Sequence, residues 1–194
     1  MIKIALVGDI GSGKTFISKL FKYPVFNADL EVSKLYKDRN IIKKIKKTFP
    51  NQNFSSPIKK NELINCILSN SNNLKRLSKI VHPMIRKKMF IFLSKNKSKK
   101  FLILDIPLYL ENKLNRKQDI IVFIESKNKD IKSRLLKRKN YNSKLLKLLK
   151  KIQLPLVVKK RKSNFIIKNN FSIKKAKKSI KHILTNLRHE RNNT

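Results

Sequence analysis

The chain has 194 residues, of which 40% are hydrophobic, and it carries a formal net charge of +38 and one cysteine, Cys66. This length suits a single α/β domain, and a lone cysteine excludes an internal disulfide and a thiolate metal cluster, so we expect Cys66 in or near the core. The sequence has no run near the ~20 apolar residues that span a bilayer, and its first residues lead straight into a strand, so we expect a cytoplasmic protein with no membrane partner.

The first predicted element is a buried strand at Ile2–Val7. It leads directly into residues 8–15, GDIGSGKT, which fit the phosphate-binding pattern GxxxxGK[ST] in full. All three glycines of the chain, Gly8, Gly11 and Gly13, fall inside these eight residues, where positive φ or close approach to a ligand requires them. A strand, a glycine loop and a helix-forming segment predict a site that holds polyphosphate through backbone N–H groups.

The loop supplies most of the predicted nucleotide site. Lys14 is expected to reach the β- and γ-phosphates of ATP, and the Thr15 hydroxyl to ligate Mg²⁺. The expected nucleotide-binding residues here are Gly8, Asp9, Ile10, Gly11, Ser12, Gly13, Lys14, Thr15 and Phe16.

Later apolar runs predict the rest of a sheet: Pro24–Ala28, Phe101–Ile106, Ile120–Ile124 and the shorter Phe165–Ile167. Because strands alternate with helical segments, we expect a three-layer α/β/α fold with a five-stranded parallel sheet. Ligands of such sheets bind beyond the carboxyl ends of the strands. The polar residues that close the strands are therefore site candidates: Asp9, Asp29, Asp105, Glu111 and Glu125.

About 70 residues between the second and third strands contain no convincing strand. Apolar residues at helical spacing predict helices near Leu30–Tyr36, Ile41–Phe49, Glu62–Leu68 and Leu74–Leu93. One crossover helix does not need this length, so residues 30–100 are interpreted as a helical insertion that binds the substrate.

Two basic helical segments, near 127–139 and Ser143–Lys151, predict a lid over residues 127–159 that closes over ATP and excludes water. The last helix, near Ile173–Leu187, has one apolar face, and we expect Arg188–Thr194 to fray. The whole chain is then one domain, whose core is made of residues 1–29, 101–126 and 160–187.

The high charge does not by itself indicate a nucleic-acid partner. Lysine outnumbers arginine 40 to nine, and alanine occurs three times. Lysine, asparagine and isoleucine share AT-rich codons, so a mutational bias explains the composition without a ligand. Nucleic-acid sites tend to use arginine for bidentate contacts and aromatic side chains for stacking. We therefore expect a solvated basic surface and no specific nucleic-acid partner.

Several motifs follow one another in the order and spacing of one enzyme family: the loop, Asn27-Ala28-Asp29, Val81-His82-Pro83, residues 106–111 (IPLYLE) and Gln153-Leu154-Pro155. From residue 2 to about 170 the chain resembles dephospho-CoA kinase. The resemblance implies a P-loop kinase with a helical substrate-binding insertion and a helical lid. It also implies transfer of the γ-phosphate of ATP to the 3′-hydroxyl of the dephospho-CoA ribose, the last step of CoA synthesis.

Two aspartates at strand ends carry the predicted chemistry. Asp29 matches the family's catalytic aspartate, and its place after the second strand makes it the best candidate to accept the proton of the ribose hydroxyl. Its alternative role is to cap the helix that begins near Leu30. Asp105 is expected either to reach Mg²⁺ together with Thr15 or to form a structural hydrogen bond.

The resemblance implies further site residues. Arg138 corresponds to the lid arginine that neutralises the transferring phosphate, and it completes a catalytic set with Lys14 and Asp29. Asn169 matches a loop near the adenine, and Lys159 matches a basic position near the nucleotide.

Three other residues are assigned to the acceptor. Pro107 lies in the segment expected on the substrate side. His82 either contacts the substrate or is structural, and Glu111 either contacts the substrate or starts a helix.

The chain departs from the family's pattern at several positions. The first carboxylate of the usual Asp-Ala-Asp is Asn27, the Arg-Asp pair of the lid is Arg138-Lys139, and the glycine after Asn-Asn is Phe171. Further departures, near the glutamine and the last strand, are Leu149-Lys150 and Ser163-Asn164. These changes affect the expected lid contacts and leave the loop and Asp29 as the family has them.

The expected partners are dephospho-CoA and ATP, and we expect a monomer. Two other functions stay open from the sequence. One is another small P-loop kinase that acts on a nucleotide or metabolite. The other is a basic, ATP-dependent nucleic-acid-binding protein.

Overall fold

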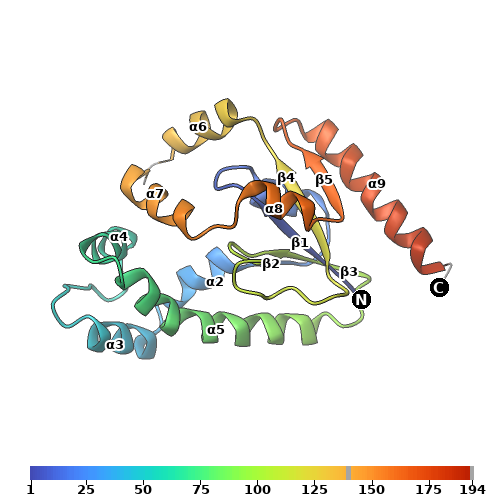
Figure 1. The fold of residues 1–194 in the computed structure, drawn as a ribbon. Helices are drawn as coiled ribbons and strands as arrows, with labels where there is room; N and C mark the ends of the chain where they lie inside the picture. The colour runs from blue at the N-terminus through green and yellow to red at the C-terminus, as the bar shows by residue number, and fades with distance from the viewer. Residues whose placement is uncertain (139–140, 193–194) are drawn as a thin grey trace. The chain divides into compact units, whose positions relative to one another are not determined.

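The central element is a parallel sheet, seen in a computed structural model that describes residues 1–138 and 141–192 (Figure 1). Within these residues the sheet has five strands in the order β2-β3-β1-β4-β5, and every neighbouring pair is parallel. The strands are β1 (Ile2–Gly8), β2 (Val25–Asn27), β3 (Phe101–Asp105), β4 (Ile120–Glu125) and β5 (Phe165–Lys168). The predicted five-stranded parallel sheet is confirmed.

The strands are continuous apolar runs because helices cover both faces of the sheet. Ile4 and Leu6 of β1 point into a core shared with α1 (Lys14–Leu20) and α9 (Ile173–Asn192). The alternate residues of β1 point to the opposite face, and the short helix α8 (Leu156–Arg161) packs against this strand. The result is the predicted three-layer α/β/α arrangement.

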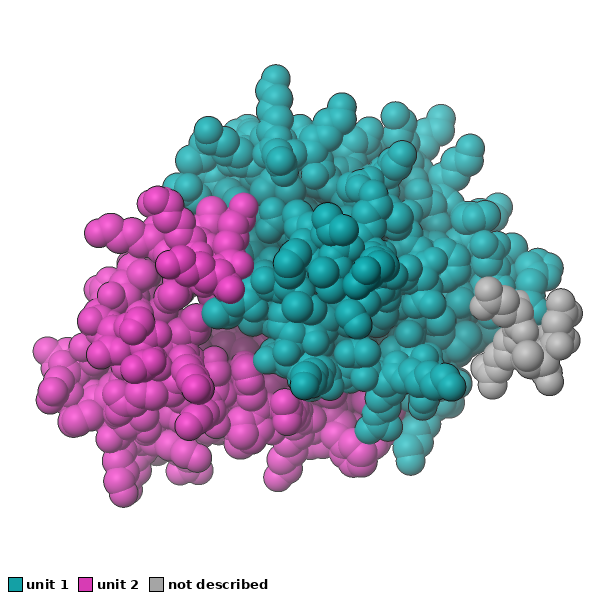
Figure 2. Space-filling model, viewed as in Figure 1, with its two compact units in different colours: residues 1–27, 96–141, 152–194 teal, residues 28–95, 142–151 magenta. Residues whose placement is uncertain are grey.

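The chain divides into two compact units, coloured separately in Figure 2. Unit 1 consists of Met1–Asn27, Asn96–Tyr141 and Ile152–Thr194, and it contains the sheet and α6 (Asn128–Leu136). Unit 2 consists of Ala28–Lys95 and Asn142–Lys151. The expected insertion at 30–100 falls mainly in unit 2, whereas the expected lid is divided between the units. The prediction of one domain made of core, insertion and lid stays a prediction.

Unit 2 is helical and has its own apolar core. Its helices are α2 (Ala28–Leu35), α3 (Arg39–Thr48), α4 (Lys60–Ser69), α5 (Asn73–Lys95) and α7 (Ser143–Lys151). The core includes Ile45 of α3, Leu77 of α5 and Cys66, whose thiol has a raised pKa because it is buried. Cys66 is thus the core residue that the sequence predicted.

The observed elements differ from the predicted ones in three places. The strand β2 ends at Asn27 because α2 already begins at Ala28. Helix α8 was not predicted, since six residues after Pro155 give too short a periodic pattern. The prediction that the chain frays from Arg188 is wrong as far as Asn192. Helix α9 continues to that residue, through a segment with no glycine or proline. Residues 139–140 of the predicted lid and residues 193–194 of the predicted tail lie outside the described residues.

None of the described helices is both long enough and apolar enough to cross a membrane.

A buried ionic cluster joins the first strand to the segment before β4. Lys3 Nζ lies 2.5 Å from Oδ1 of Asp119, whose side chain is fully buried. The other oxygen of Asp119 accepts hydrogen bonds from the Tyr109 hydroxyl at 2.6 Å and from the Arg116 N–H at 2.8 Å. Burial, with the neighbouring Asp119, raises the pKa of Tyr109, so its hydroxyl stays protonated and donates.

We predict that Asp119→Ala lowers the free energy of unfolding by about 3–5 kcal/mol, because it leaves the Lys3 ammonium buried and unpaired. Urea titration followed by circular dichroism measures the change. Asp38→Ala is a milder comparison, because Asp38 caps α3 by accepting from the N–H groups of Asn40 and Ile41, and its loss is worth about 1 kcal/mol. Equal losses for both variants would contradict the prediction.

Candidate active site

The loop between β1 and α1 has the backbone that its three glycines predict. The φ angles of Gly8, Gly11 and Gly13 are 146°, 90° and 92°. A Cβ at Gly8 would lie 2.6 Å from the Ile124 carbonyl oxygen, and one at Gly13 would overlap Nδ2 of Asn169. Glycine is therefore needed at both positions, for the dihedral angle and for the close packing of the loop.

Lys14 folds back across this loop. Its Nζ donates to the carbonyl oxygens of Asp9 at 2.7 Å and Gly8 at 3.3 Å. The Asp9 carboxylate in turn accepts from the N–H of Ile10 at 2.7 Å. The ammonium group is thus held over the loop by neutral oxygens, which a phosphate group would replace with a stronger, charge-assisted acceptor.

The ends of β4 and β5 hold the loop at the Ser12 carbonyl. This oxygen accepts from Nδ2 of Asn169 and from Oγ of Ser126, both at 2.8 Å. Asn169 is 4% exposed, donates its N–H to the Glu125 carbonyl at 2.7 Å and accepts from the N–H of Phe171 at 2.9 Å. Asn169, which the sequence assigned to nucleotide binding, is thereby engaged in shaping the phosphate loop.

Phe171, the residue after Asn169-Asn170, has a φ of +63°. A left-handed backbone costs a bulky residue on the order of 1 kcal/mol. The Phe171 ring lies beneath the Arg134 guanidinium, whose carbon is 3.9 Å from the ring centroid, and its centroid is 6.1 Å from that of Phe16. A cation–π contact of this kind is worth about 0.5–1 kcal/mol, so the stack offsets much of the backbone cost.

Thr15 and Asp105 meet at the carboxyl ends of the strands. The Thr15 hydroxyl donates to Oδ2 of Asp105 at 2.6 Å, and Nδ2 of Asn27 donates to the same oxygen at 2.7 Å. Asp105 is 3% exposed. Burial raises its pKa, and the Thr15 hydrogen bond, the Lys14 charge and the Asn27 hydrogen bond oppose that rise.

These two side chains fit a magnesium ion. A hydroxyl and a carboxylate are hard oxygen donors, and Mg²⁺ is commonly held by one or two such groups together with phosphate oxygens and water. The described residues contain no group of three or more His, Cys, Asp or Glu side chains that would form a dedicated metal centre. The donors therefore suit a cation that arrives with a nucleotide.

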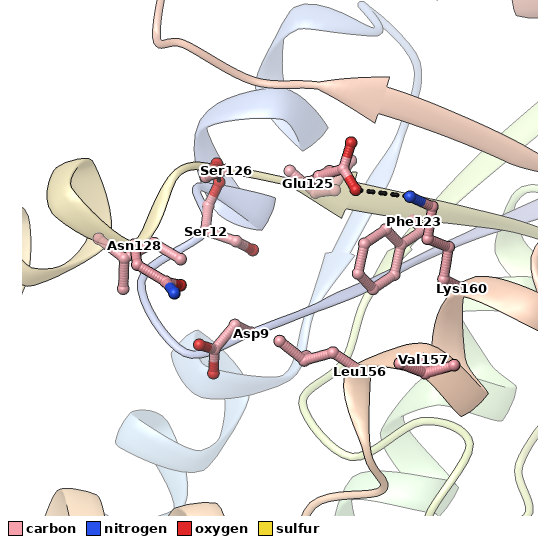
Figure 3. Close-up of a pocket in the computed structure, with 11 residues that line it drawn as sticks. Asp9, Ser12, Phe123, Glu125, Ser126, Asn128, Leu156, Val157 and Lys160 are labelled. Carbon is pink, nitrogen blue, oxygen red and sulfur yellow. Dashed lines mark hydrogen bonds and ion pairs between the residues drawn. The ribbon is translucent and has the colours of Figure 1, made fainter.

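A cavity of about 280 Å³ adjoins the loop (Figure 3). Asp9 and Ser12 of the loop line it, together with apolar side chains such as Phe123 of β4 and Leu156 of α8. The Glu125 carboxylate and Lys160 Nζ form an ion pair of 2.7 Å at this cavity. The cavity lies at the carboxyl ends of β1 and β4, the edge where the sequence predicted a ligand site.

Glu111 and Lys159 form a second buried ion pair, at 2.7 Å, with side chains 9% and 3% exposed. Glu111 also accepts from the N–H of Leu154 at 3.0 Å, and Lys159 donates to Oε1 of Gln153 at 3.2 Å. Glu111 lies in a turn, so its predicted alternative role as a helix start is wrong. The expected substrate contact of Glu111 and the expected nucleotide contact of Lys159 stay predictions.

Asp29 and His82 belong to unit 2. Asp29 is exposed in the first turn of α2, which begins one residue earlier, so its alternative role as the helix cap is wrong. Burial, and to a lesser extent the charge of Asp29, raises the pKa of Tyr36 to about 12. His82 is half-buried before Pro83 in α5, and burial, helped by the positive Arg86, lowers its pKa.

Two further predicted residues belong to unit 1. Arg138 is exposed just after α6, where its carbonyl accepts from the N–H of Tyr141 at 2.9 Å. Pro107 is half-buried in the turn that follows β3.

The fold and the loop define the class of P-loop kinases: a phosphate loop joins the central parallel strand to a helix, and its Thr15 meets an acidic strand end. A family model described as dephospho-CoA kinase matches residues 2–175. The chain belongs to the dephospho-CoA kinase family, whose members transfer phosphate to an alcohol group.

Individual relatives agree with this family. A dephospho-CoA kinase of Wolbachia sp. subsp. Brugia malayi is 35% identical over 190 residues, which cover 95% of this chain and 97% of the relative. Among solved structures, TT1252 from Thermus thermophilus superposes with a TM-score of 0.78 at 23% identity, covering 96% of this chain and 97% of that one. Dephospho-CoA kinase from Campylobacter jejuni gives a TM-score of 0.62 at 20% identity, covering 95% and 96%. The two structures support the fold.

We predict that Asn169→Ala raises the Kd for ATP about tenfold, because the Ser12 carbonyl loses one of its two donors, the Phe171 N–H loses its acceptor, and the loop loosens. Isothermal titration calorimetry with ATP measures the change. Asn170→Ala is the matched control, since Asn170 is exposed and accepts only from the N–H of Ser172 at 3.2 Å. An unchanged Kd in Asn169→Ala would show that the loop keeps its shape without this side chain.

Proposed function

We propose that this protein phosphorylates the 3′-hydroxyl of dephospho-CoA with ATP and Mg²⁺ and so forms CoA. The observation that carries the proposal is the preassembled phosphate loop, with Lys14 over its carbonyl oxygens and Thr15 joined to Asp105. Family membership over residues 2–175 supports the choice of acceptor. We further propose a cytoplasmic monomer that has no specific nucleic-acid partner.

The phosphate loop binds and orients the donor. Its N–H groups and the first turn of α1 receive the β- and γ-phosphates, and Lys14 exchanges the carbonyls of Gly8 and Asp9 for phosphate oxygens. Thr15 and Asp105 would hold Mg²⁺, which would neutralise charge on the phosphates. Phosphoryl transfer mainly needs alignment of the reacting groups and neutralisation of charge. These residues therefore contribute most of the catalysis.

Asp29 orients the acceptor hydroxyl and takes its proton late in the transfer. The exposed carboxylate at the start of α2 is accessible to a ligand. Arg138, exposed after α6, neutralises the phosphate in transfer, a task that suits a planar group with several N–H donors. His82 and Pro107 are assigned to the dephospho-CoA side. Since its pKa is lowered, His82 is neutral at pH 7 and offers one donor and one acceptor.

We predict that Lys14→Ala and Asp29→Asn fail differently. Lys14 touches phosphate both before and during transfer, so its loss weakens ATP binding as well as turnover. Asp29→Asn mainly lowers kcat, by about 10²–10⁴, because it removes the proton acceptor. Steady-state kinetics with CoA measured by mass, together with calorimetric ATP titration, separates the two effects.

The matched control for Asp29 is Glu31→Gln on the same helix. Glu31 pairs with Lys34 at 2.5 Å and with Lys88 at 3.0 Å, and the Lys34 hydrogen bond is the main reason that its pKa is lowered. Turnover of Glu31→Gln is expected to stay within about twofold of wild type. Normal turnover in Asp29→Asn would remove Asp29 from the reaction.

We predict that dephospho-CoA is phosphorylated well and that adenosine and AMP are phosphorylated poorly. The helical insertion is larger than a nucleoside needs, and binding of the pantetheine arm is used to align the reacting hydroxyl. His82→Ala should raise the KM for dephospho-CoA more than the KM for ATP. His182→Ala, an exposed histidine of α9, is the control that changes neither. Equal phosphorylation of AMP and dephospho-CoA would contradict the proposed acceptor and favour a nucleotide kinase activity.

A further inference from the structure

Asn27 lies beside the two residues to which the proposed function assigns the cation. It is the last residue of β2, and its register partner in the parallel strand β3 is Asp105. Side chains of register partners project from the same face of a sheet, which explains why Nδ2 of Asn27 reaches Oδ2 of Asp105 at 2.7 Å. Thr15 donates to the same oxygen at 2.6 Å, from the first turn of α1.

The two donors act on one carboxylate oxygen. Oδ2 of Asp105 accepts both hydrogen bonds, and Oδ1 has no hydrogen bond to any residue that the structure describes. A carboxylate only accepts, so the Asn27 amide must present its NH₂ group to it. With Oδ2 held from two directions, rotation of the carboxylate is restricted, and Oδ1 is left for a cation or a water molecule.

Asn27 also sets the charge of this group. Asp105 is the one carboxylate in the Thr15, Asn27 and Asp105 cluster, and Asn27 contributes a dipole with no net charge. An aspartate at position 27 would place a second carboxylate within hydrogen-bond distance of the first. Two such groups cannot both stay ionised at that distance unless a cation lies between them. The cluster with Asn27 contains one carboxylate and needs no cation to relieve such repulsion.

We propose that Asn27 is a positioning residue of the metal site, which holds the Asp105 carboxylate in its receiving orientation before the cation arrives. The cluster is thereby assembled without a divalent cation. Because it carries a single negative charge, its intrinsic affinity for the cation is lower than that of a cluster with aspartate at position 27. The inference rests on the proposed role of Thr15 and Asp105 toward Mg²⁺.

The test compares Asn27→Asp and Asn27→Ala with the wild type and needs no acceptor substrate. Mn²⁺ serves as the spectroscopic probe, and its binding to the ADP complex is followed by electron paramagnetic resonance. Asn27→Asp should lower the Kd for Mn²⁺ about tenfold, because it adds a negative charge beside Asp105. Asn27→Ala should raise that Kd about fivefold, because the carboxylate loses its orientation. Asn170→Asp, which adds the same charge at an exposed position, should leave the Kd unchanged.

Thermal unfolding without nucleotide gives an independent readout. The Tm of the wild type should differ by less than about 1 °C between EDTA and excess Mg²⁺, since the cluster does not need the cation. The Tm of Asn27→Asp should fall by about 3 °C in EDTA and recover in Mg²⁺, because the cation relieves the repulsion between the carboxylates. A merely structural Asn27 would lower the Tm on substitution with no dependence on the cation.

Two outcomes would overturn the inference: a wild-type Kd for Mn²⁺ in Asn27→Asp, or a wild-type Tm that depends on Mg²⁺ as strongly as that of Asn27→Asp. Failure of the proposed function is seen separately, as absence of CoA formation by a wild-type protein that gives the expected Mn²⁺ and Tm results. If ADP does not bind at all, the Tm comparison alone decides the role of Asn27.

Discussion

The active site depends on one buried carbonyl oxygen, that of Ser12. Ser12 is fully buried, so its carbonyl oxygen needs a donor from the protein. Asn169 after β5 and Ser126 after β4 supply the donors to Ser12, and both residues are placed by strands that pair with one another. The register of β4 and β5 therefore sets the positions of both donors to Ser12, and through them the conformation of the phosphate loop. The packing that stabilises unit 1 thus also shapes this loop.

The two charged side chains beside this loop, Lys14 and Asp105, are held by neighbouring protein groups. Lys14 rests on carbonyl oxygens, and the Asp105 carboxylate rests on Thr15 and Asn27. Side chains held near their working positions lose little conformational freedom on binding, so more of the interaction energy remains for aligning the reacting groups. Burial raises the pKa of Asp105, and its three polar neighbours oppose only part of that rise by favouring the ionised carboxylate.

The sequence alone predicts the parts of the molecule whose cause is local. Buried parallel strands are continuous apolar runs, and the glycine loop after Ile2–Val7 has a short, specific pattern, so both were predicted correctly. The pairs Lys3 with Asp119 and Glu111 with Lys159 join residues far apart in the chain, and a chain this rich in lysine gives no sign of which lysine is buried. Asn27 looked like a missing acid in the motif, and its hydrogen bond to Asp105 became visible only with the register of β2 and β3.

The order of the strands in the sheet has a consequence for synthesis on the ribosome. β1 is made first but pairs only with β3 and β4, and β3 does not begin until Phe101. At a translation rate of about 5–20 residues per second, this apolar strand waits roughly 5–20 s for a partner. The intervening helices of residues 28–95 have a core of their own that forms from neighbouring segments. During that interval the nascent chain exposes an unpaired apolar strand, which makes it a natural client for a chaperone near the ribosome exit.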